Sequence, residues 1–315
     1  MKKMLFKQKS DISIEVAYEL FFRKCKVKNL SEQSLTYYND KYRILSSYVD
    51  TSEPINLFTR DVVDDYILWL RGKDLKDVTI NSYLRMLRAF LYFCMESGYL
   101  ETYQIKMIKA NKEIKQTYTD EELAKLLKRP NMSKCSFAEL KTWAYINYLL
   151  GTGNRISTAL SVRIGDIDFD NDVITLTKLK NRKQQVIPLS HTLADVLSDY
   201  LEIRGGNEDD YLFCNDYGTK ASTRTYQDLL TKYNHNRGVL KTSSHLFRHT
   251  FAKNWILAGG DIIRLQKILG HSDLSVTKEY LNMFGQDLQI DFDKFNPLDR
   301  FNRDKGEKIQ IKKRA

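Results

Sequence analysis

Hydrophobic residues recur at helical spacing along the first hundred residues of the chain. This spacing predicts helices over about residues 13–27, 32–49, 60–71 and 78–97. Side chains that can cap a helix stand before the last three of these, at Ser31, Thr59 and Asp77, and Gly98 can end the fourth. We therefore expect a small, entirely helical domain here.

The pattern becomes polar and rich in lysine after Tyr99, and residues 102–117 are expected to form a linker. Thr119 and Glu122 then form a capping box, which starts a new helix. Helices are expected near 120–128 and 136–151. Residues 173–189 alternate apolar and polar positions on either side of a charged turn, which predicts a β-hairpin.

Helical spacing resumes after Ser190. A short strand is expected at 211–213, and helices are expected near 222–236, 246–258, 261–269 and 275–283. Gly259 and Gly270 are placed to end two of these helices. The whole pattern predicts a mainly α protein, with an N-terminal helical domain followed by an α-rich domain that contains a small β-hairpin or sheet.

Composition and charge narrow the class of protein. The chain has 315 residues, 42% hydrophobic and 12% aromatic, which fits two folded domains and excludes wholesale disorder. Its formal net charge of +10 favours a polyanionic partner, and nucleic acid is the first candidate. No apolar run is long enough to cross a bilayer or to act as a secretory signal, so we expect a cytoplasmic protein. The four cysteines, widely spaced and without a CxxC pair, are expected to be reduced thiols.

The predicted helix at 78–97 has a polar face that fits such a partner. Its apolar positions fall on one side, whereas Asn81, Arg85, Arg88 and Tyr92 fall together on another. Such a stripe is either a solvated surface or a set of contacts to phosphates and bases. Both interpretations stay open from the pattern, and Asn81, Arg85 and Arg88 are candidate DNA-binding residues.

A second group of chemically active residues lies in TSSHLFRHTFAKNWILAGGDIIRLQKILGHSDLSVTKEY, residues 242–280. His245, Arg248, His271 and Tyr280 stand there around successive helix starts, where exposed backbone amides favour anions. His245 and Arg248 are three residues apart and share a helix face, so both could reach one phosphate. The alternative is a structural histidine beside a surface arginine.

A zinc site is a competing interpretation of the same residues. His245 and His249 share a helical face, and His271 could be a third ligand. However, Leu246 stands where metalloprotease motifs place a glutamate, and no general base lies nearby. We therefore expect no metal, and we expect His249 to pack internally.

Taken together, these motifs resemble the catalytic domain of the tyrosine recombinases, the phage integrase and Xer family. The resemblance is carried in order by GTGNRISTALSVRIGDIDF, the basic hairpin, HLFRHTFA and LGHSDLSVTKEY. It is strong over residues 115–285, and the helical first hundred residues are more loosely similar to the family's core-binding (SAM-like) domain. The implied organisation is a core-binding domain, a linker, a catalytic domain and a C-terminal tail, at 10–101, 102–117, 118–290 and 291–315.

The resemblance also implies catalytic roles. Arg155 and Arg248 would hold the scissile phosphate and neutralise the charge that grows on it. His245 would assist proton transfer, and His271 would hydrogen-bond the phosphate. Tyr280 would be the nucleophile, and its position nine residues after His271 distinguishes it from Tyr217, Tyr226 and Tyr233.

The general acid that the resemblance implies lies in the basic hairpin. Lys180 stands at the family's lysine position and would protonate the leaving 5′ oxygen, with Lys178 and Lys183 as the nearby alternatives. Lys178, Arg182 and Lys183 are also candidate DNA contacts. One position departs from the family pattern, because an acidic residue usually stands three positions after the first arginine, where this chain has Thr158.

These residues imply a site-specific recombinase of a phage or other mobile element, which cleaves and rejoins DNA through a 3′-phosphotyrosine without a cofactor or a metal. Its implied partners are double-stranded DNA with paired recombination sites, other copies of the chain in a homo-tetramer, and accessory factors that bend DNA or set direction. A type IB topoisomerase, a DNA-binding regulator without catalysis and a zinc hydrolase are the alternatives.

Overall fold

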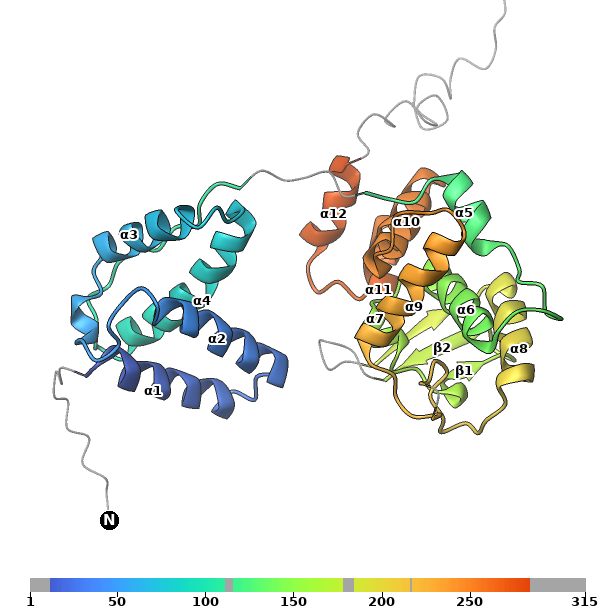
Figure 1. Cartoon of the computed structure of the whole chain (residues 1–315), viewed down its shortest axis with the longest axis horizontal. Coiled ribbons are helices and arrows are strands. Elements are labelled where there is room, and N and C mark those ends of the chain that lie inside the picture. The colour runs from blue at the N-terminus through green and yellow to red at the C-terminus, as the bar shows by residue number, and fades with distance from the viewer. Residues whose placement is uncertain (1–11, 111–115, 178–183, 216, 284–315) are drawn as a thin grey trace, which may run out of the picture. The chain divides into compact units, whose positions relative to one another are not determined.

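The computed structural model describes residues 12–110, 116–177, 184–215 and 217–283. The chain divides into two compact units, Met1–Glu113 and Ile114–Ala315, and each is described by itself (Figure 1). The described residues are mainly helical and contain one small antiparallel sheet, which confirms the predicted fold class.

The first unit is a bundle of α-helices with one short 3₁₀ helix. Its elements are α1 (Ile14–Val27), α2 (Glu32–Leu45), η1 (Ile55–Leu57), α3 (Arg60–Arg71) and α4 (Asp77–Glu96). Helices α1, α2 and α3 all pack against α4, whose apolar face is fully buried. Ser31 caps α2 as the sequence predicts, whereas the N-cap of α4 is Lys76 in place of the expected Asp77.

The chain that follows α4 returns along this unit. The Tyr103 hydroxyl donates to the Phe58 carbonyl at 2.6 Å, and Ile105 is buried in the core. The Asn81 amide donates to the Ile108 carbonyl at 2.9 Å and accepts from the Ile108 N–H at 3.0 Å. The stretch that was expected to begin a linker at residue 102 is therefore packed against the first unit.

These contacts also correct the expected role of Asn81. Its side chain is only 7% exposed, and both ends of its amide are engaged by the backbone of Ile108. Asn81 therefore fastens the returning chain and is not a free donor for DNA. Arg85 on the same helix is exposed and Arg88 is half-buried, so these two stay available to a partner.

The second unit is built around α6 (Phe137–Thr152). Because helices pack on several sides of α6, its residues are buried almost all round. The helices that contact it are α5 (Asp120–Leu127), α7 (Ile156–Ala159), α8 (His191–Arg204), α9 (Thr223–Asn236) and α10 (Ser244–Leu257). Helices α11 (Ile262–Leu269) and α12 (Leu274–Met283) then pack against α10.

A three-stranded antiparallel sheet lies in the same unit, in the order β1 (Ile167–Asp168), β2 (Val173–Leu176) and β3 (Gln185–Pro188). Strands β2 and β3 are the predicted hairpin, with Ile174 opposite Ile187. The strand expected at 211–213 is wrong, because only Tyr211 makes a single bridge, to Arg163. The apolar residues of this segment, Leu212 and Phe213, are fully buried and fill the core.

The start of the second unit is fastened to the segment around α10. The Tyr118 N–H donates to Thr250 Oγ1 at 2.9 Å, and Lys241 Nζ donates to Glu122 at 2.7 Å. Glu122 also completes the predicted capping box with Thr119. Burial alone would raise the pKa of Glu122, but the hydrogen bonds from Lys241 and from the Thr119 backbone outweigh it and lower that pKa.

Candidate active site

The second unit brings together most of the residues expected at the active site, and the ends of short elements position them. Arg155 is the N-cap of α7, directly after α6, while His245 and Arg248 lie near the start of α10. His271 follows Gly270, the left-handed residue that ends α11, and Tyr280 lies on α12. Because α12 packs against both α10 and α11, these positions converge (Figure 1).

Arg248 lies at the centre of this cluster. Its side chain is 3% exposed and donates to the carbonyls of Gly153 and Leu269, each at 2.9 Å. Burial, followed by the positive charge of the nearby Arg155, lowers the pKa of Arg248 to about 10, and Tyr280 partly opposes this change. The site therefore holds a poorly solvated cation that an anionic phosphate can stabilise.

Gly153 is required by the close packing around Arg248. Its φ of +63° is a left-handed conformation, and a Cβ added there would lie 2.6 Å from Phe251 and 2.8 Å from Leu269. Any other residue would be strained in this conformation and would push the Phe251 and Leu269 side chains aside. This is a physical reason for the GTGNR sequence before Arg155.

His271 is held in one tautomer by two hydrogen bonds. Arg248 Nη2 lies 2.7 Å from His271 Nε2, and because a guanidinium can only donate, Nε2 must accept. The proton is therefore on Nδ1, which lies 2.8 Å from Thr277 Oγ1 and donates to it. Thr277 is fully buried, so the ring and the guanidinium are fixed together.

Tyr280 is distinguished from the other tyrosines of this unit by the groups around its hydroxyl. The side chain is 2% exposed, its oxygen lies 2.9 Å from His249 Nδ1, and it interacts electrostatically with the Arg248 guanidinium. Tyr226 and Tyr233 are also buried, but their hydroxyls donate to backbone carbonyls, and burial raises the pKa of both. Tyr217 is 90% exposed. Of these four tyrosines, only Tyr280 is buried next to both an arginine, Arg248, and a histidine, His249.

Two contacts were not expected from the sequence: His249 with Tyr280, and Thr277 with His271. His249 packs against the buried Tyr280, and its Nδ1 also contacts the Tyr280 hydroxyl, which the sequence did not indicate. His245 is exposed, and its ring lies parallel to that of His249 with the centroids 5.8 Å apart. The sequence signals were present but weak: His249 shares a helix face with His245, and Thr277 precedes Tyr280 by three residues.

The geometry does not favour zinc. Both ring nitrogens of His271 are used by Arg248 and Thr277, so neither is available to a metal. Within the described ranges there is no group of three or more His, Cys, Asp or Glu side chains placed to hold a metal ion. All four cysteines are unpaired thiols, as expected.

The hairpin lysines cannot be placed against this cluster. The four basic candidates of the turn, Lys178, Lys180, Arg182 and Lys183, lie outside the described residues. The base of the hairpin, however, is tied to the site, because the Gln185 amide donates to the carbonyls of Lys267 and, at 3.1 Å, Ile268. Those carbonyls stand at the end of α11, directly before the Leu269 carbonyl that Arg248 binds.

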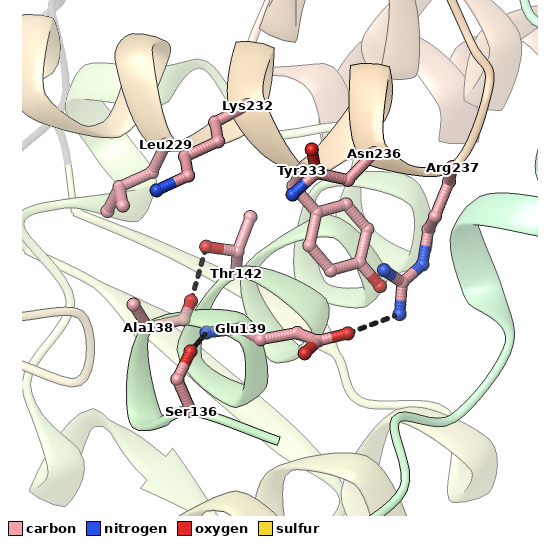
Figure 2. A pocket seen from close by; sticks show the side chains of 9 residues that line it. All are labelled: Ser136, Ala138, Glu139, Thr142, Leu229, Lys232, Tyr233, Asn236 and Arg237. Atoms are coloured by element: carbon pink, nitrogen blue, oxygen red, sulfur yellow. Dashed lines mark hydrogen bonds and ion pairs between the residues drawn. The ribbon is translucent and has the colours of Figure 1, made fainter. Parts of the chain in front are cut away.

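A separate pocket lies between the start of α6 and the end of α9 (Figure 2). In it Arg237 pairs with Glu139 at 3.0 Å, and its guanidinium lies 3.9 Å from the centre of the Tyr233 ring. None of the catalytic candidates lines this pocket. The Arg237–Glu139 pair holds the end of α9 on the start of α6, so we treat the pocket as part of the framework.

Comparison with known families assigns the chain to a class. The Phage integrase SAM-like domain matches residues 17–114, and the Phage integrase family matches residues 101–286, which is more than half of the chain. The chain therefore belongs to the phage integrase family. It is a tyrosine recombinase, an enzyme that cleaves and rejoins DNA in site-specific recombination.

Individual relatives agree with this assignment. The tyrosine recombinase XerC of Chlamydia caviae is 28% identical over 242 residues, which cover 74% of this chain and 77% of XerC. XerA of Thermococcus kodakarensis is 31% identical over 218 residues, 68% of this chain and 74% of XerA. No helix of the described segments has the length and apolar character needed to span a bilayer.

Solved structures share the fold. The Tn1549 transposon integrase in complex with transposon right end DNA has a TM-score of 0.72 at 22% identity, and the match covers 84% of this chain and 94% of that one. A lambda integrase dimer bound to a COC′ core site has a TM-score of 0.70 at 15% identity, covering 96% of this chain and 100% of that one.

Proposed function

We propose that this recombinase cleaves DNA by attack of the Tyr280 hydroxyl on a phosphodiester, and that it moves a phage or other mobile element between paired sites. The observation that carries the proposal is the position of the Tyr280 hydroxyl, which is hydrogen-bonded to His249 and lies close enough to Arg248 to raise the pKa of its guanidinium. Arg248 is in turn fixed by His271, so the nucleophile and the phosphate-binding cation belong to one cluster.

In this proposal the bond between phosphorus and the 5′ oxygen breaks as the bond between phosphorus and the Tyr280 oxygen forms. The product is a 3′-phosphotyrosine and a 5′ hydroxyl, which attacks the linkage of a partner strand in the reverse step. Arg155 and Arg248 hold the phosphate and stabilise the charge of the five-coordinate transition state. Lys180 protonates the departing 5′ oxygen, and His245, exposed at the start of α10, contacts the phosphate and assists proton transfer.

We propose that the first unit grips the duplex through the exposed face of α4, where Arg85 and Arg88 supply phosphate contacts. The net charge of +10 supports a DNA partner. The two DNA-bound structures that share the fold, of a transposon integrase and of lambda integrase, motivate both a mobile-element substrate and an assembly of several copies. A homo-tetramer on two paired sites, helped by accessory DNA-bending factors, is the assembly we propose.

The test uses duplexes from either side of the encoding gene, nicked so that the 5′ hydroxyl fragment diffuses away after cleavage. Wild type should form a covalent protein–DNA band, and Tyr280→Phe should form none. The matched control is Tyr217→Phe, which removes the hydroxyl of a tyrosine that is 90% exposed and should behave as wild type. A band that persists in Tyr280→Phe contradicts the proposal.

Two further results separate this reaction from its alternatives. Arg248→Ala should abolish the band while salt-sensitive DNA binding remains, whereas a regulator without catalysis would form no band in any variant. Relaxation of a supercoiled plasmid that lacks the paired sites would indicate a type IB topoisomerase instead.

A further inference from the structure

The Tyr280 hydroxyl lies between two side chains that follow one another on α10. His249 Nδ1 is 2.9 Å from the hydroxyl oxygen, and Tyr280 is close enough to the Arg248 guanidinium to raise the pKa of that group. A guanidinium can only donate a hydrogen bond, and a phenol carries a single proton. In the tautomer with the His249 proton on Nε2, Nδ1 is an acceptor 2.9 Å from the hydroxyl oxygen, and the Tyr280 hydroxyl donates to it.

This arrangement addresses a chemical difficulty of the proposed reaction. A phenol has a pKa of about 10, so at neutral pH it is a poor nucleophile unless a base removes its proton as the new bond forms. Arg248 stabilises the negative charge that develops on the Tyr280 oxygen, but a cation cannot take the proton. The imidazole of His249, with Nδ1 2.9 Å from the hydroxyl oxygen, is a group that can.

We propose that His249 is the general base of the cleavage step, accepting the phenolic proton of Tyr280 on Nδ1. The inference rests on the proposed function of Tyr280 as nucleophile. The O–H bond of Tyr280 breaks as its oxygen bonds to phosphorus, the proton moves to Nδ1, and the 5′ oxygen leaves with a proton from Lys180. In the rejoining step, His249 returns the proton to Tyr280.

His249 fits this role better than His245, which the family resemblance had pointed to for proton transfer. His249 is partly buried and touches the reacting oxygen, whereas His245 is exposed and its ring lies beside that of His249. The two histidines then have different roles: His249 accepts the proton of the nucleophile, and His245 contacts the phosphate.

The test measures the single-turnover rate of the covalent band on a nicked duplex for His249→Asn and His249→Ala. An asparagine Oδ1 can accept the Tyr280 hydrogen bond where Nδ1 stands, but it cannot take the proton. Both variants should therefore be slower by roughly 100-fold, the usual contribution of a general base. The matched control, His235→Asn, changes an exposed histidine at the end of α9 and should leave the rate unchanged.

A second measurement separates base catalysis from a structural role. Replacing Tyr280 with a fluorinated tyrosine makes the phenol more acidic, so the reaction depends less on a base. In the His249→Asn background this replacement should restore much of the lost rate, which a structural defect would not allow. DNA binding and thermal unfolding of His249→Asn should match wild type.

Three results would overturn the inference. If His249→Asn cleaves at the wild-type rate, the contact only positions the tyrosine. If His249→Ala cleaves faster than wild type, the contact restrains the tyrosine. If the fluorinated tyrosine gives no recovery, the missing function is not proton removal. A band that persists in Tyr280→Phe is distinct from all three, because it refutes the proposed nucleophile itself.

Discussion

Arg248 Nη2 lies 2.7 Å from His271 Nε2, so the guanidinium donates to a neutral imidazole whose other nitrogen is protonated. The buried Thr277 hydroxyl, 2.8 Å from Nδ1, accepts a hydrogen bond from that N–H. A chain of hydrogen bonds thus runs from α12 through the loop after α11 to α10. Thr277 therefore helps to orient Arg248 through His271, together with the Gly153 and Leu269 carbonyls that Arg248 also binds.

Thr277→Val should slow DNA cleavage without preventing folding. Valine keeps the shape of threonine but cannot accept from His271 Nδ1, so the ring loses the contact that fixes its tautomer. Loss of one such hydrogen bond, about 1 kcal/mol, corresponds to a decrease of roughly 5-fold in the single-turnover rate of the covalent band. Thr277→Ser, which keeps the hydroxyl, is the control and should retain most of the rate. Equal rates for valine and wild type would show that His271 is oriented by other contacts.

Glu122→Gln should destabilise the second unit by about 1 kcal/mol at pH 7, because it weakens both the capping box and the pair with Lys241. The lowered pKa of Glu122 gives the sign of the pH dependence. The carboxylate stabilises the fold above its ordinary pKa of 4.5, and this contribution is lost as the pH falls through the lower folded value. The difference in melting temperature between wild type and variant should therefore be full at pH 7 and shrink below pH 4.5. A difference that grows on acidification would contradict this.

Asn81 and Arg85 should respond in opposite ways to substitution by alanine, although they lie on the same helix. Asn81→Ala leaves the Ile108 N–H and carbonyl without partners and should cost about 1–3 kcal/mol locally. Hydrogen exchange of the Ile108 amide should become faster. Arg85→Ala should leave that exchange unchanged but weaken DNA binding and reduce its salt dependence by about one phosphate contact. Unchanged exchange in Asn81→Ala would show that the returning chain is held elsewhere.

The helices could be predicted from the sequence because their signals are local. The Ser31 cap, the Thr119–Glu122 capping box and the glycine that ends α11 each act within a few residues, and all appear as predicted. The apolar run at 211–213 led to the wrong prediction of a strand for a related reason. An apolar triplet is the same in a strand and in a core-filling segment, and only the surrounding helices decide between them.

The partners of the site residues could not be predicted in the same way. The Arg248, His271 and Tyr280 positions followed from the family resemblance, but the contact of His249 with Tyr280 spans 31 residues and depends on how α12 lies against α10. The polar face of α4 likewise gave no sign that the chain after Tyr99 returns to engage Asn81. The hydrophobic periodicity of a helix identifies its polar face, but only the tertiary structure shows which segments pack against that face.

The central claim is that Tyr280 becomes bonded to DNA, and mass spectrometry of the trapped complex tests it most directly. Cleavage after lysine releases the segment 279–294, EYLNMFGQDLQIDFDK, in which Tyr280 is the single hydroxyl-bearing side chain. After nuclease digestion, this peptide should carry the mass of a nucleotide joined through a 3′ phosphate. A nucleotide on any other peptide, with 279–294 unmodified, would contradict the account.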